Sequence, residues 1–178
     1  MYKRQIVGCL GGLFTLSSCT APTNVKDYSA YVNPFIGTGG HGHTFPGAVV
    51  PHGMIQPSPD TRIDGWDACS GYYYADSTIN GFSHTHVSGT GCCDYGDVLL
   101  MPTVGKQQYR TTDPQSQRLA YASSFSHKNE IAEPGYYSVF LDTYQVKAEI
   151  SSTKRGAIHR YTFPENAESG FIIDLDLS

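Results

Sequence analysis

The sequence predicts a mainly β protein, an antiparallel β-sandwich, and three observations support this prediction. Tyrosine and phenylalanine are abundant, with 13 and 8 residues in a chain of 178, and aromatic residues are enriched in strands. Glycine and proline are also frequent, at 19 and 10 residues, which is typical of sheets joined by structured loops. Beyond Pro134, apolar and polar residues alternate with a period of two.

The first 18 residues, 1–18, are expected to be a signal peptide that is not part of the fold. Two basic residues precede the apolar run IVGCLGGLFTL, which is too short to span a bilayer. The following LSSC resembles a bacterial lipoprotein signal, cleaved just before Cys19, which would then carry the lipid. Residues 19–27 form a polar tether. We therefore expect an exported, membrane-anchored lipoprotein that is periplasmic or on the cell surface. An ordinary secretory signal cut elsewhere is the alternative.

Residues 28–178 are expected to form one domain, which is loop-rich as far as Gly105. The stretch FIGTGGHGHTFPGAVVPHGMIQPSPDTR, residues 35–62, mixes glycine, histidine and proline in a way that no helix or regular strand tolerates. It predicts a loop held in one shape, and ordered loops of this kind often carry function. The apolar run DVLLMPTVG, residues 97–105, is consistent with a short buried strand.

The second half of the domain contains the clearest strands. Residues 106–133 are polar, and SHKNEIAE within them is expected to hold at most a short helical turn. The runs YYSVFLDTYQVKAEIS, GAIHRYTFP and GFIIDLDLS then alternate, which predicts antiparallel strands with one packed face and one wetter face. One face of each run carries, in order, Val146, Ala148 and Ile150; Ala157, His159, Tyr161 and Phe163; and Phe171, Ile173, Leu175 and Leu177.

Charge and cysteine content exclude some classes of partner. The formal net charge is −4 and no basic run is present, so nucleic acid is not an expected partner. After signal cleavage and lipidation, Cys69, Cys92 and Cys93 remain. One disulfide from Cys69 to one of the adjacent pair is compatible with an oxidising compartment, but the connectivity cannot be read from the sequence. No C-x-x-C spacing supports a zinc site.

Histidines are candidates for chemistry in two places. The glycine-rich loop contains His41, His43 and His52. If residues 82–87 form a strand, His84 and His86 project from the same face and could ligate a transition metal. The alternative is that these imidazoles satisfy buried hydrogen bonds or bind a polar ligand. No spacing fixes a third ligand, so no residue is assigned to a metal.

The stretch DTRIDGWDACSGYYYAD, residues 60–76, offers the chemistry of a sugar site. Aromatic rings stack on the apolar face of a pyranose, while carboxylates and guanidinium groups hydrogen-bond its hydroxyls. A solvated turn around a buried tryptophan is the alternative interpretation. No complete catalytic apparatus is visible, because neither a catalytic carboxylate pair nor a nucleophile elbow can be placed by spacing.

Five motifs together carry a family resemblance. YVNPFIGTGGHGHTFPGAVVPHGMIQPSPDT, GYYYADSTINGFSHTHVSGTG, GDVLLMP, AEPGYYSV and HRYTFP resemble the N-terminal domain of glycoside hydrolase family 92, whose members are mostly calcium-dependent exo-acting α-mannosidases. The resemblance covers nearly all of residues 27–178 in the right order and spacing. It implies a β-sandwich of the galactose-mutarotase-like supersandwich type, followed in the family by an (α/α)6 barrel.

The resemblance also implies how the chemistry is divided. Family members invert the anomeric carbon, and the acid, the base and most calcium ligands are expected in the barrel, beyond residue 178. We therefore expect no catalytic residue in this chain, and a domain truncated at its C-terminus. The expected partners are mannose-containing glycans, the missing barrel and, through the lipid, the outer membrane.

To this domain the resemblance assigns one wall of the mannose pocket in an enzyme acting on N-glycans or mannan. Trp66 would stack on the sugar, and the neighbouring charged residues would grip its hydroxyls. The glycine-rich loop would form a rigid rim at the domain junction. A stand-alone carbohydrate-binding lipoprotein without activity is the alternative. The implied substrate-binding residues are Asp60, Arg62, Trp66, Asp67, Cys69, His84 and His86.

Overall fold

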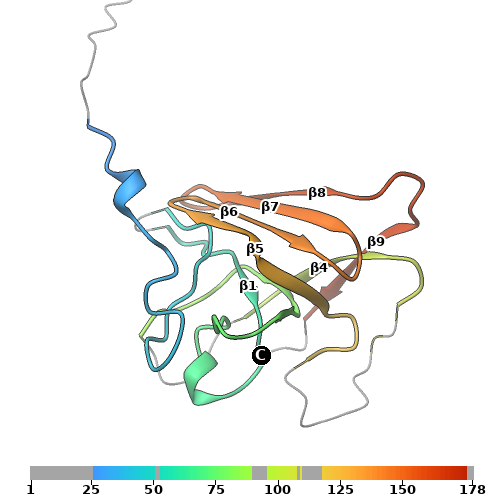
Figure 1. Ribbon diagram of the computed structural model, residues 1–178, viewed down its shortest axis with the longest axis horizontal. Coiled ribbons are helices and arrows are strands. Elements are labelled where there is room, and N and C mark those ends of the chain that lie inside the picture. Colours follow the sequence, from blue (N-terminus) through green and yellow to red (C-terminus); the bar gives the residue numbers. More distant parts are fainter. Residues whose placement is uncertain (1–25, 51–52, 90–95, 108, 110–117, 176–178) are drawn as a thin grey trace, which may run out of the picture.

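Two antiparallel sheets packed face to face form the fold (Figure 1). The computed structural model describes residues 26–50, 53–89, 96–107, 109 and 118–175. One sheet has the strand order β1-β3-β4-β9 and the other β2-β5-β6-β7-β8. The predicted mainly β sandwich is therefore confirmed. The strands are β1 (Ser58–Asp60), β2 (Thr78–Ile79), β3 (Gly81–Ser83), β4 (Leu99–Val104), β5 (Ser123–Glu133), β6 (Tyr136–Leu141), β7 (Val146–Ser152), β8 (Ala157–Thr162) and β9 (Ser169–Asp174).

Helical structure within the described ranges is limited to two 3-10 segments, η1 (Ser29–Tyr31) and η2 (Trp66–Ala68). In this part of the chain, no helix has the length and apolar character needed to cross a membrane. The residues expected to form the signal peptide, the expected tether as far as residue 25 and the expected lipidation residue Cys19 lie outside the described residues. So do His52, Cys92, Cys93 and Leu177.

The hydrophobic core lies between the two sheets and receives side chains from both. Each fully buried large apolar side chain stabilises the fold by about 1.5–3 kcal/mol. The first sheet contributes Phe82, Leu99, Met101 and Ile172, and the second contributes Ile79, Phe125, Tyr137, Val139, Leu141, Val146, Ala148 and Ile150.

The strands expected from period-two alternation are present at β7 and β8, and the strand expected from the short apolar run is present at β4. On β7, Val146 and Ala148 are fully buried while Lys147 between them is exposed. On β8, His159 and Tyr161 face inward, and Arg160 between them is exposed. The alternation works here because one face of each strand packs on the core and the other is wetter, although Glu149 on the outer face of β7 is buried by its hydrogen bonds with Arg160.

Strand β5 corrects the expectation of a polar segment with a short helical turn. Its pairing with β6 shifts register between Phe125 and Glu130, which is the sign of a bulge. Before the shift the inward-facing residues are odd-numbered, and after it they are even-numbered. The shift therefore buries Glu130 and leaves Ile131 half exposed. A bulge that reverses the parity removes the regular period on which strand prediction depends.

On β9 the expected alternation is present, but the more apolar set is the exposed one. Phe171 and Ile173 are 55% and 62% exposed, whereas Ile172 is buried. The cause is the register with β4, in which Ile172 lies opposite the buried Met101. Directly opposite residues share a face of the sheet, so the pairing fixes which side of β9 faces the core.

Candidate functional site

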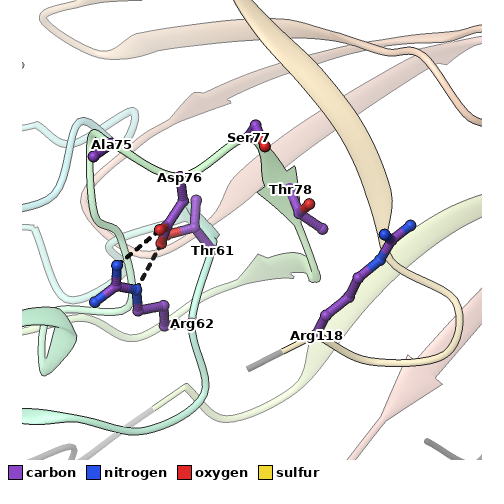
Figure 2. A pocket seen from close by; sticks show the side chains of 7 residues that line it. All are labelled: Thr61, Arg62, Ala75, Asp76, Ser77, Thr78 and Arg118. Atoms are coloured by element: carbon purple, nitrogen blue, oxygen red, sulfur yellow. Dashed lines mark hydrogen bonds and ion pairs between the residues drawn. The ribbon is translucent and has the colours of Figure 1, made fainter. Parts of the chain in front are cut away.

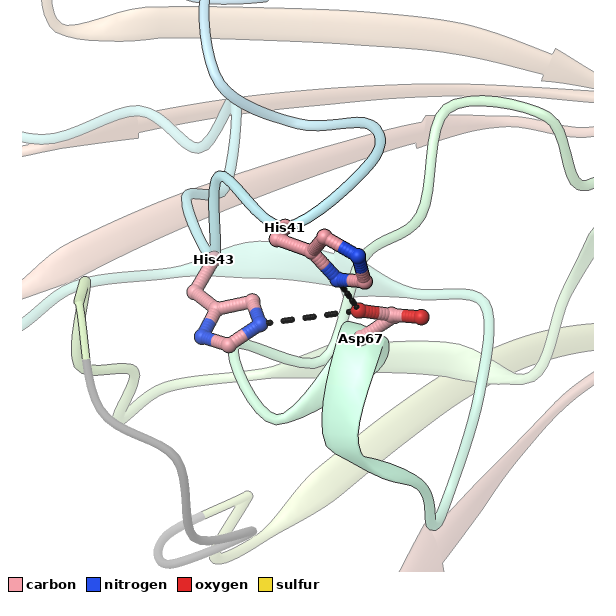
Figure 3. A group of neighbouring side chains, drawn as sticks. All are labelled: His41, His43 and Asp67. Carbon is pink, nitrogen blue, oxygen red and sulfur yellow. Dashed lines mark hydrogen bonds and ion pairs between the residues drawn. The ribbon is translucent and has the colours of Figure 1, made fainter.

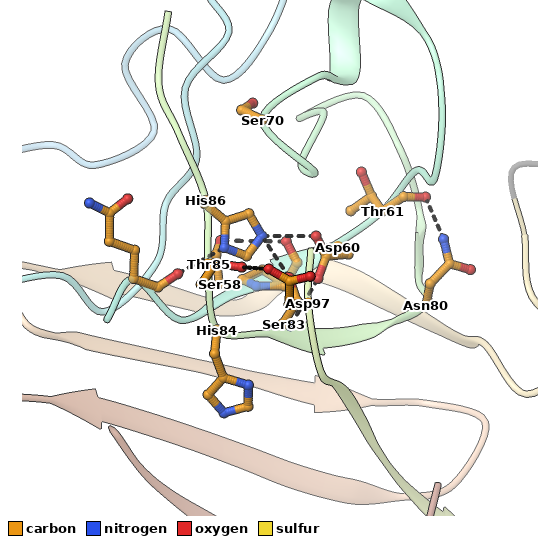
Figure 4. A network of polar contacts seen from close by, with 12 residues as sticks. Ser58, Asp60, Thr61, Ser70, Asn80, Ser83, His84, Thr85, His86 and Asp97 are labelled. Atoms are coloured by element: carbon orange, nitrogen blue, oxygen red, sulfur yellow. Dashed lines mark hydrogen bonds and ion pairs between the residues drawn. The ribbon is translucent and has the colours of Figure 1, made fainter. Parts of the chain in front are cut away.

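Asp60, at the end of β1, is the centre of a buried polar network (Figure 4). One of its carboxylate oxygens accepts a hydrogen bond from the Ser83 backbone N–H at 2.9 Å. The other lies 2.8 Å from Nε2 of His86. The remaining ring nitrogen of His86, Nδ1, donates to the carbonyl oxygen of Gln56 at 2.8 Å. Both side chains are almost completely buried, so they pin the segments that carry them.

The two nitrogens of His86 both face acceptors, so its ring carries both protons. A carbonyl oxygen can only accept, and the carboxylate of Asp60 also accepts. Burial by itself would lower the pKa of His86, but the charge of Asp60 and the two hydrogen bonds outweigh burial and raise it. The result is a buried ion pair between an imidazolium and a carboxylate.

Ser83, His86 and Asp60 nevertheless do not form a catalytic triad. In such a triad the acid orients one ring nitrogen while the serine uses the other. Here the Ser83 hydroxyl, at 3.1 Å, and Asp60 both contact Nε2, and Ser83 is fully buried. The network supports the surrounding loops.

Arg62 lines a separate pocket with a volume of about 270 Å³ (Figure 2). Asp76 holds its guanidinium with two hydrogen bonds of 2.9 and 2.8 Å, and the ring of Tyr73 lies 4.2 Å from its central carbon. Arg118 lies on the opposite side of the pocket (Figure 2). The volume is close to the lower end of the ~300–1,000 Å³ range of ligand pockets. The lining residues are Thr61, Arg62, Ala75, Asp76, Ser77, Thr78 and Arg118, so Trp66 and Asp67 do not contribute.

Trp66 and Asp67 belong to η2. Figure 3 shows Asp67 next to His41 and His43 of the glycine-rich loop. Trp66 is 63% exposed, and its ring meets the ring of His43 edge to face with centroids 5.1 Å apart. Asp67 lies 2.5 Å from Nδ1 of His41 and 3.7 Å from Nε2 of His43. The hydrogen bond with His41 lowers the pKa of Asp67, with smaller contributions from both imidazoles, so this carboxylate is charged at neutral pH.

His84 and His86 do not share a face, which corrects the expectation of a paired-imidazole site on a strand. Strand β3 ends at Ser83, and the two rings point in different directions (Figure 4). His84 turns toward the second sheet, where its Nε2 lies 3.0 Å from Nε2 of His159. Its Nδ1 donates to the carbonyl oxygen of Val98 at 3.0 Å, so Nε2 accepts the proton of His159. The other nitrogen of His159 then accepts from the hydroxyl of Tyr161 at 2.8 Å.

The buried imidazole of His159 makes stability depend on pH. Burial, followed by the charge of His84, lowers the pKa of His159 from 6.5 to about 4. Between about pH 6.5 and 4 the unfolded chain protonates this histidine and the folded protein does not, so the free energy of unfolding of the wild type falls as the pH falls through this range.

We expect His159→Gln, which cannot be protonated, to show a smaller fall. The difference between the two proteins is at most about 1.4 kcal/mol for each pH unit. Urea unfolding followed by circular dichroism at pH 4.5 and 7.5 measures this difference. Parallel pH profiles for the two proteins would contradict it.

Contacts between loops bring these groups into one region of the molecule. The hydroxyl of Ser70 donates a hydrogen bond to the carbonyl oxygen of Thr44. The backbone N–H of Thr61 donates one to the carbonyl oxygen of Gly71. A side chain at Gly71, where φ is +85°, would clash with both Asp60 and His86. Cys69 is buried.

Sequence reasoning missed the partners that hold the predicted residues. Asp76, which pairs with Arg62, lies 14 residues further along the chain, and His41 lies 26 residues before Asp67. Asp76 and His41 were both within or beside the quoted motifs, but no spacing rule pairs residues that lie 14 or 26 positions apart. The buried Glu130 gave no signal, because it lies in a polar segment without regular period.

The described residues do not fit a calcium site. Among them, the one group of side chains whose ligand atoms converge contains two imidazoles and a single carboxylate. Calcium prefers six to eight oxygen ligands, so this group does not suit it.

Comparison with known proteins connects this arrangement to a family. Residues 31–178 match the family model described as the glycosyl hydrolase family 92 N-terminal domain. The chain is also 33% identical over 147 residues to an uncharacterized secreted glycosidase of Arthroderma benhamiae, a match covering 80% of this chain and 18% of the relative.

Solved structures of family members have the same fold. The family GH92 α-mannosidase BT3965 from Bacteroides thetaiotaomicron, in complex with mannoimidazole, matches with a TM-score of 0.78 and 44% identity over 83% of this chain and 20% of its own. The inverting mannosidase BT2199 from the same species has a TM-score of 0.68 and 33% identity, covering 84% of this chain and 20% of its own. This chain therefore spans about a fifth of the length of these relatives. It belongs to glycoside hydrolase family 92 and corresponds to the N-terminal domain of that family.

Proposed function

We propose that this domain supplies one wall of the mannose pocket in an inverting exo-α-mannosidase that acts on N-glycans or mannan. The observation that carries the proposal is Trp66, an exposed indole held in place by His43 beside the charged Asp67. An indole with one open face offers a stacking surface for a sugar ring, and an adjacent carboxylate accepts hydrogen bonds from hydroxyl groups. The α-mannosidase names of similar structures support mannose as that sugar.

The proposed wall divides its residues into those that contact sugar and those that position them. Trp66 and Asp67 contact the ring, and Arg62, which is oriented by Asp76 in a separate pocket, binds a hydroxyl group of the glycan. Asp60 and His86 are buried and act by holding the loops that carry the others. Inversion requires an acid and a base with room for water between them. In this proposal those carboxylates and the ligands of calcium belong to the remainder of the enzyme, and no step is assigned to calcium here.

The same proposal includes the cellular location. A relative described as a secreted glycosidase supports export. We further propose that residues 1–18 are removed as a signal peptide and that Cys19 carries a lipid that anchors the protein to the outer membrane. Intact-mass measurement of the membrane-extracted protein would test the anchor, because an unmodified Cys19 contradicts it.

Replacement of Trp66 tests the pocket assignment. In the protein expressed from its complete reading frame, Trp66→Ala is expected to raise the KM for an aryl α-mannoside at least tenfold, because the stacking surface is lost. Tyr31→Ala, which removes an aromatic side chain that is 78% exposed on η1, is the matched control and is expected to leave KM unchanged. Equal kinetics for the wild type and a folded Trp66→Ala variant would overturn the assignment.

A further inference from the structure

His41, His43 and Asp67 bring three potential metal-ligand atoms together at the surface (Figure 3). Nδ1 of His41, Nε2 of His43 and a carboxylate oxygen of Asp67 all lie within 4.8 Å of one another. They come from two separate segments, the glycine-rich loop and η2. We propose that these three side chains bind one divalent transition-metal ion, for which zinc is the representative.

The backbone holds two of the three ligands in position before any ion binds. His43 has a left-handed conformation with φ of 52°, and its carbonyl oxygen accepts a hydrogen bond from the Gly89 N–H at 2.7 Å. The turn before it is closed so tightly that a side chain at Gly42 would lie 2.1 Å from the carbonyl oxygen of Gly37. Asp67 is fixed by its place in η2. A site built on fixed backbone loses little conformational entropy when the ion binds.

The distances are compatible with tetrahedral coordination. Two ligand atoms that are each ~2.0–2.1 Å from a tetrahedral zinc ion are ~3.3–3.4 Å apart. The separation between Asp67 and His43 is 3.7 Å, close to this value, whereas the 2.5 Å between Asp67 and His41 is that of a hydrogen bond. The His41 side chain is 81% exposed, so its ring is free to turn. A movement of ~1 Å away from Asp67 makes room for a metal ion in place of the shared proton.

The donor set selects the class of metal. Two imidazole nitrogens and one carboxylate oxygen suit zinc and other first-row transition metals and are unfavourable for calcium. The exposure of His41 and Asp67 leaves the fourth position open to water. A metal ion binds the neutral form of imidazole, so acid competes with the ion for these ligands. This proposal concerns metal binding by the domain alone and does not rest on mannose recognition.

Calorimetric titration with zinc chloride tests the site. The chelator-treated chain, with its thiols alkylated to exclude cysteine ligands, is titrated at pH 7.5. We expect one zinc ion per chain, and at least tenfold weaker binding in both His41→Ala and Asp67→Asn. Both changes are at exposed side chains, so these variants should fold, whereas His43 is buried. The titration with calcium chloride is expected to give no binding heat.

Two controls separate this proposal from its alternatives. His127→Ala removes an imidazole that also contacts a carboxylate, at 2.6 Å from Glu130, and is expected to leave zinc affinity within about twofold of wild type. Trp66→Ala should retain zinc binding even where it abolishes mannoside recognition, which distinguishes failure of this site from failure of the proposed function. Absence of zinc binding, or zinc binding that both His41→Ala and Asp67→Asn retain in full, would overturn the proposal.

Discussion

Asp60→Ala is expected to lower the free energy of unfolding by about 3 kcal/mol, because breaking a buried ion pair leaves an uncompensated group inside the protein. The substitution removes the counter-ion of His86 and the acceptor of the Ser83 backbone N–H. Each buried group that loses its hydrogen-bond partner costs roughly 1–3 kcal/mol.

Urea unfolding followed by circular dichroism measures the decrease in the free energy of unfolding. Glu165→Ala, in an exposed turn, is the control and is expected to stay within about 0.5 kcal/mol of wild type.

The loss should also depend on pH in a defined direction. In the wild type, the raised pKa of His86 contributes stability at acidic pH that is lost as pH rises through the folded-state value. Without Asp60, burial dominates and lowers the pKa of His86, so acid destabilises the variant. The penalty for Asp60→Ala is therefore larger at pH 6 than at pH 9. A penalty that is equal at both pH values would show that His86 is not charged in the folded protein.

Glu130→Ala is expected to lower the free energy of unfolding by about 2–5 kcal/mol, since two buried phenol groups lose their acceptor. The hydroxyls of Tyr72 and Tyr137 donate to Glu130 at 3.0 and 2.6 Å, and His127 contacts the same carboxylate at 2.6 Å. Burial, and in the wild type also the charge of Glu130, raises the pKa of each tyrosine. Burial persists in the variant, so both phenols stay protonated and keep O–H groups without an acceptor. Urea unfolding is again the measurement.

Two further variants on β5 test whether the loss of stability comes from the carboxylate of Glu130. Glu133→Ala removes an exposed glutamate from the same strand and should be nearly neutral. Glu130→Gln keeps an acceptor oxygen and should lose less than Glu130→Ala. If Glu130→Ala and Glu133→Ala are equally stable, the carboxylate at position 130 does not serve as the buried acceptor described above.

The sequence was sufficient to predict the strands whose pattern is regular. Strands β7 and β8 alternate without interruption, so Val146 and Tyr161 could be assigned to the inner face from spacing alone. At β5 the bulge reverses the parity, and a pattern read with a fixed period cannot detect where that happens. At β9 the inward face is set by pairing with β4, and pairing is a long-range property that local hydrophobicity does not contain.

The arrangement of the candidate site was not predictable from the sequence. The exposure of Trp66 contradicts the alternative of a buried tryptophan, and sugar binding by Trp66 and Asp67 stays a prediction. Burial of Asp60 and His86 was not predictable, because a short polar motif gives no measure of how deeply each side chain lies. The contact between Asp67 and His41 depends on the closed glycine turn, which brings together residues 26 positions apart.

Hydrolysis of an aryl α-mannoside tests the central claim most directly. The rate is measured for the protein expressed from its complete reading frame and for the 178-residue chain, each with calcium and with a chelator. If this domain forms one wall of a pocket whose catalytic carboxylates and calcium belong to the rest of the enzyme, the complete protein hydrolyses the substrate in a calcium-dependent manner. The 178-residue chain then shows no turnover above buffer. Turnover by that chain alone, or a complete protein inactive on every α-mannoside, would contradict the account.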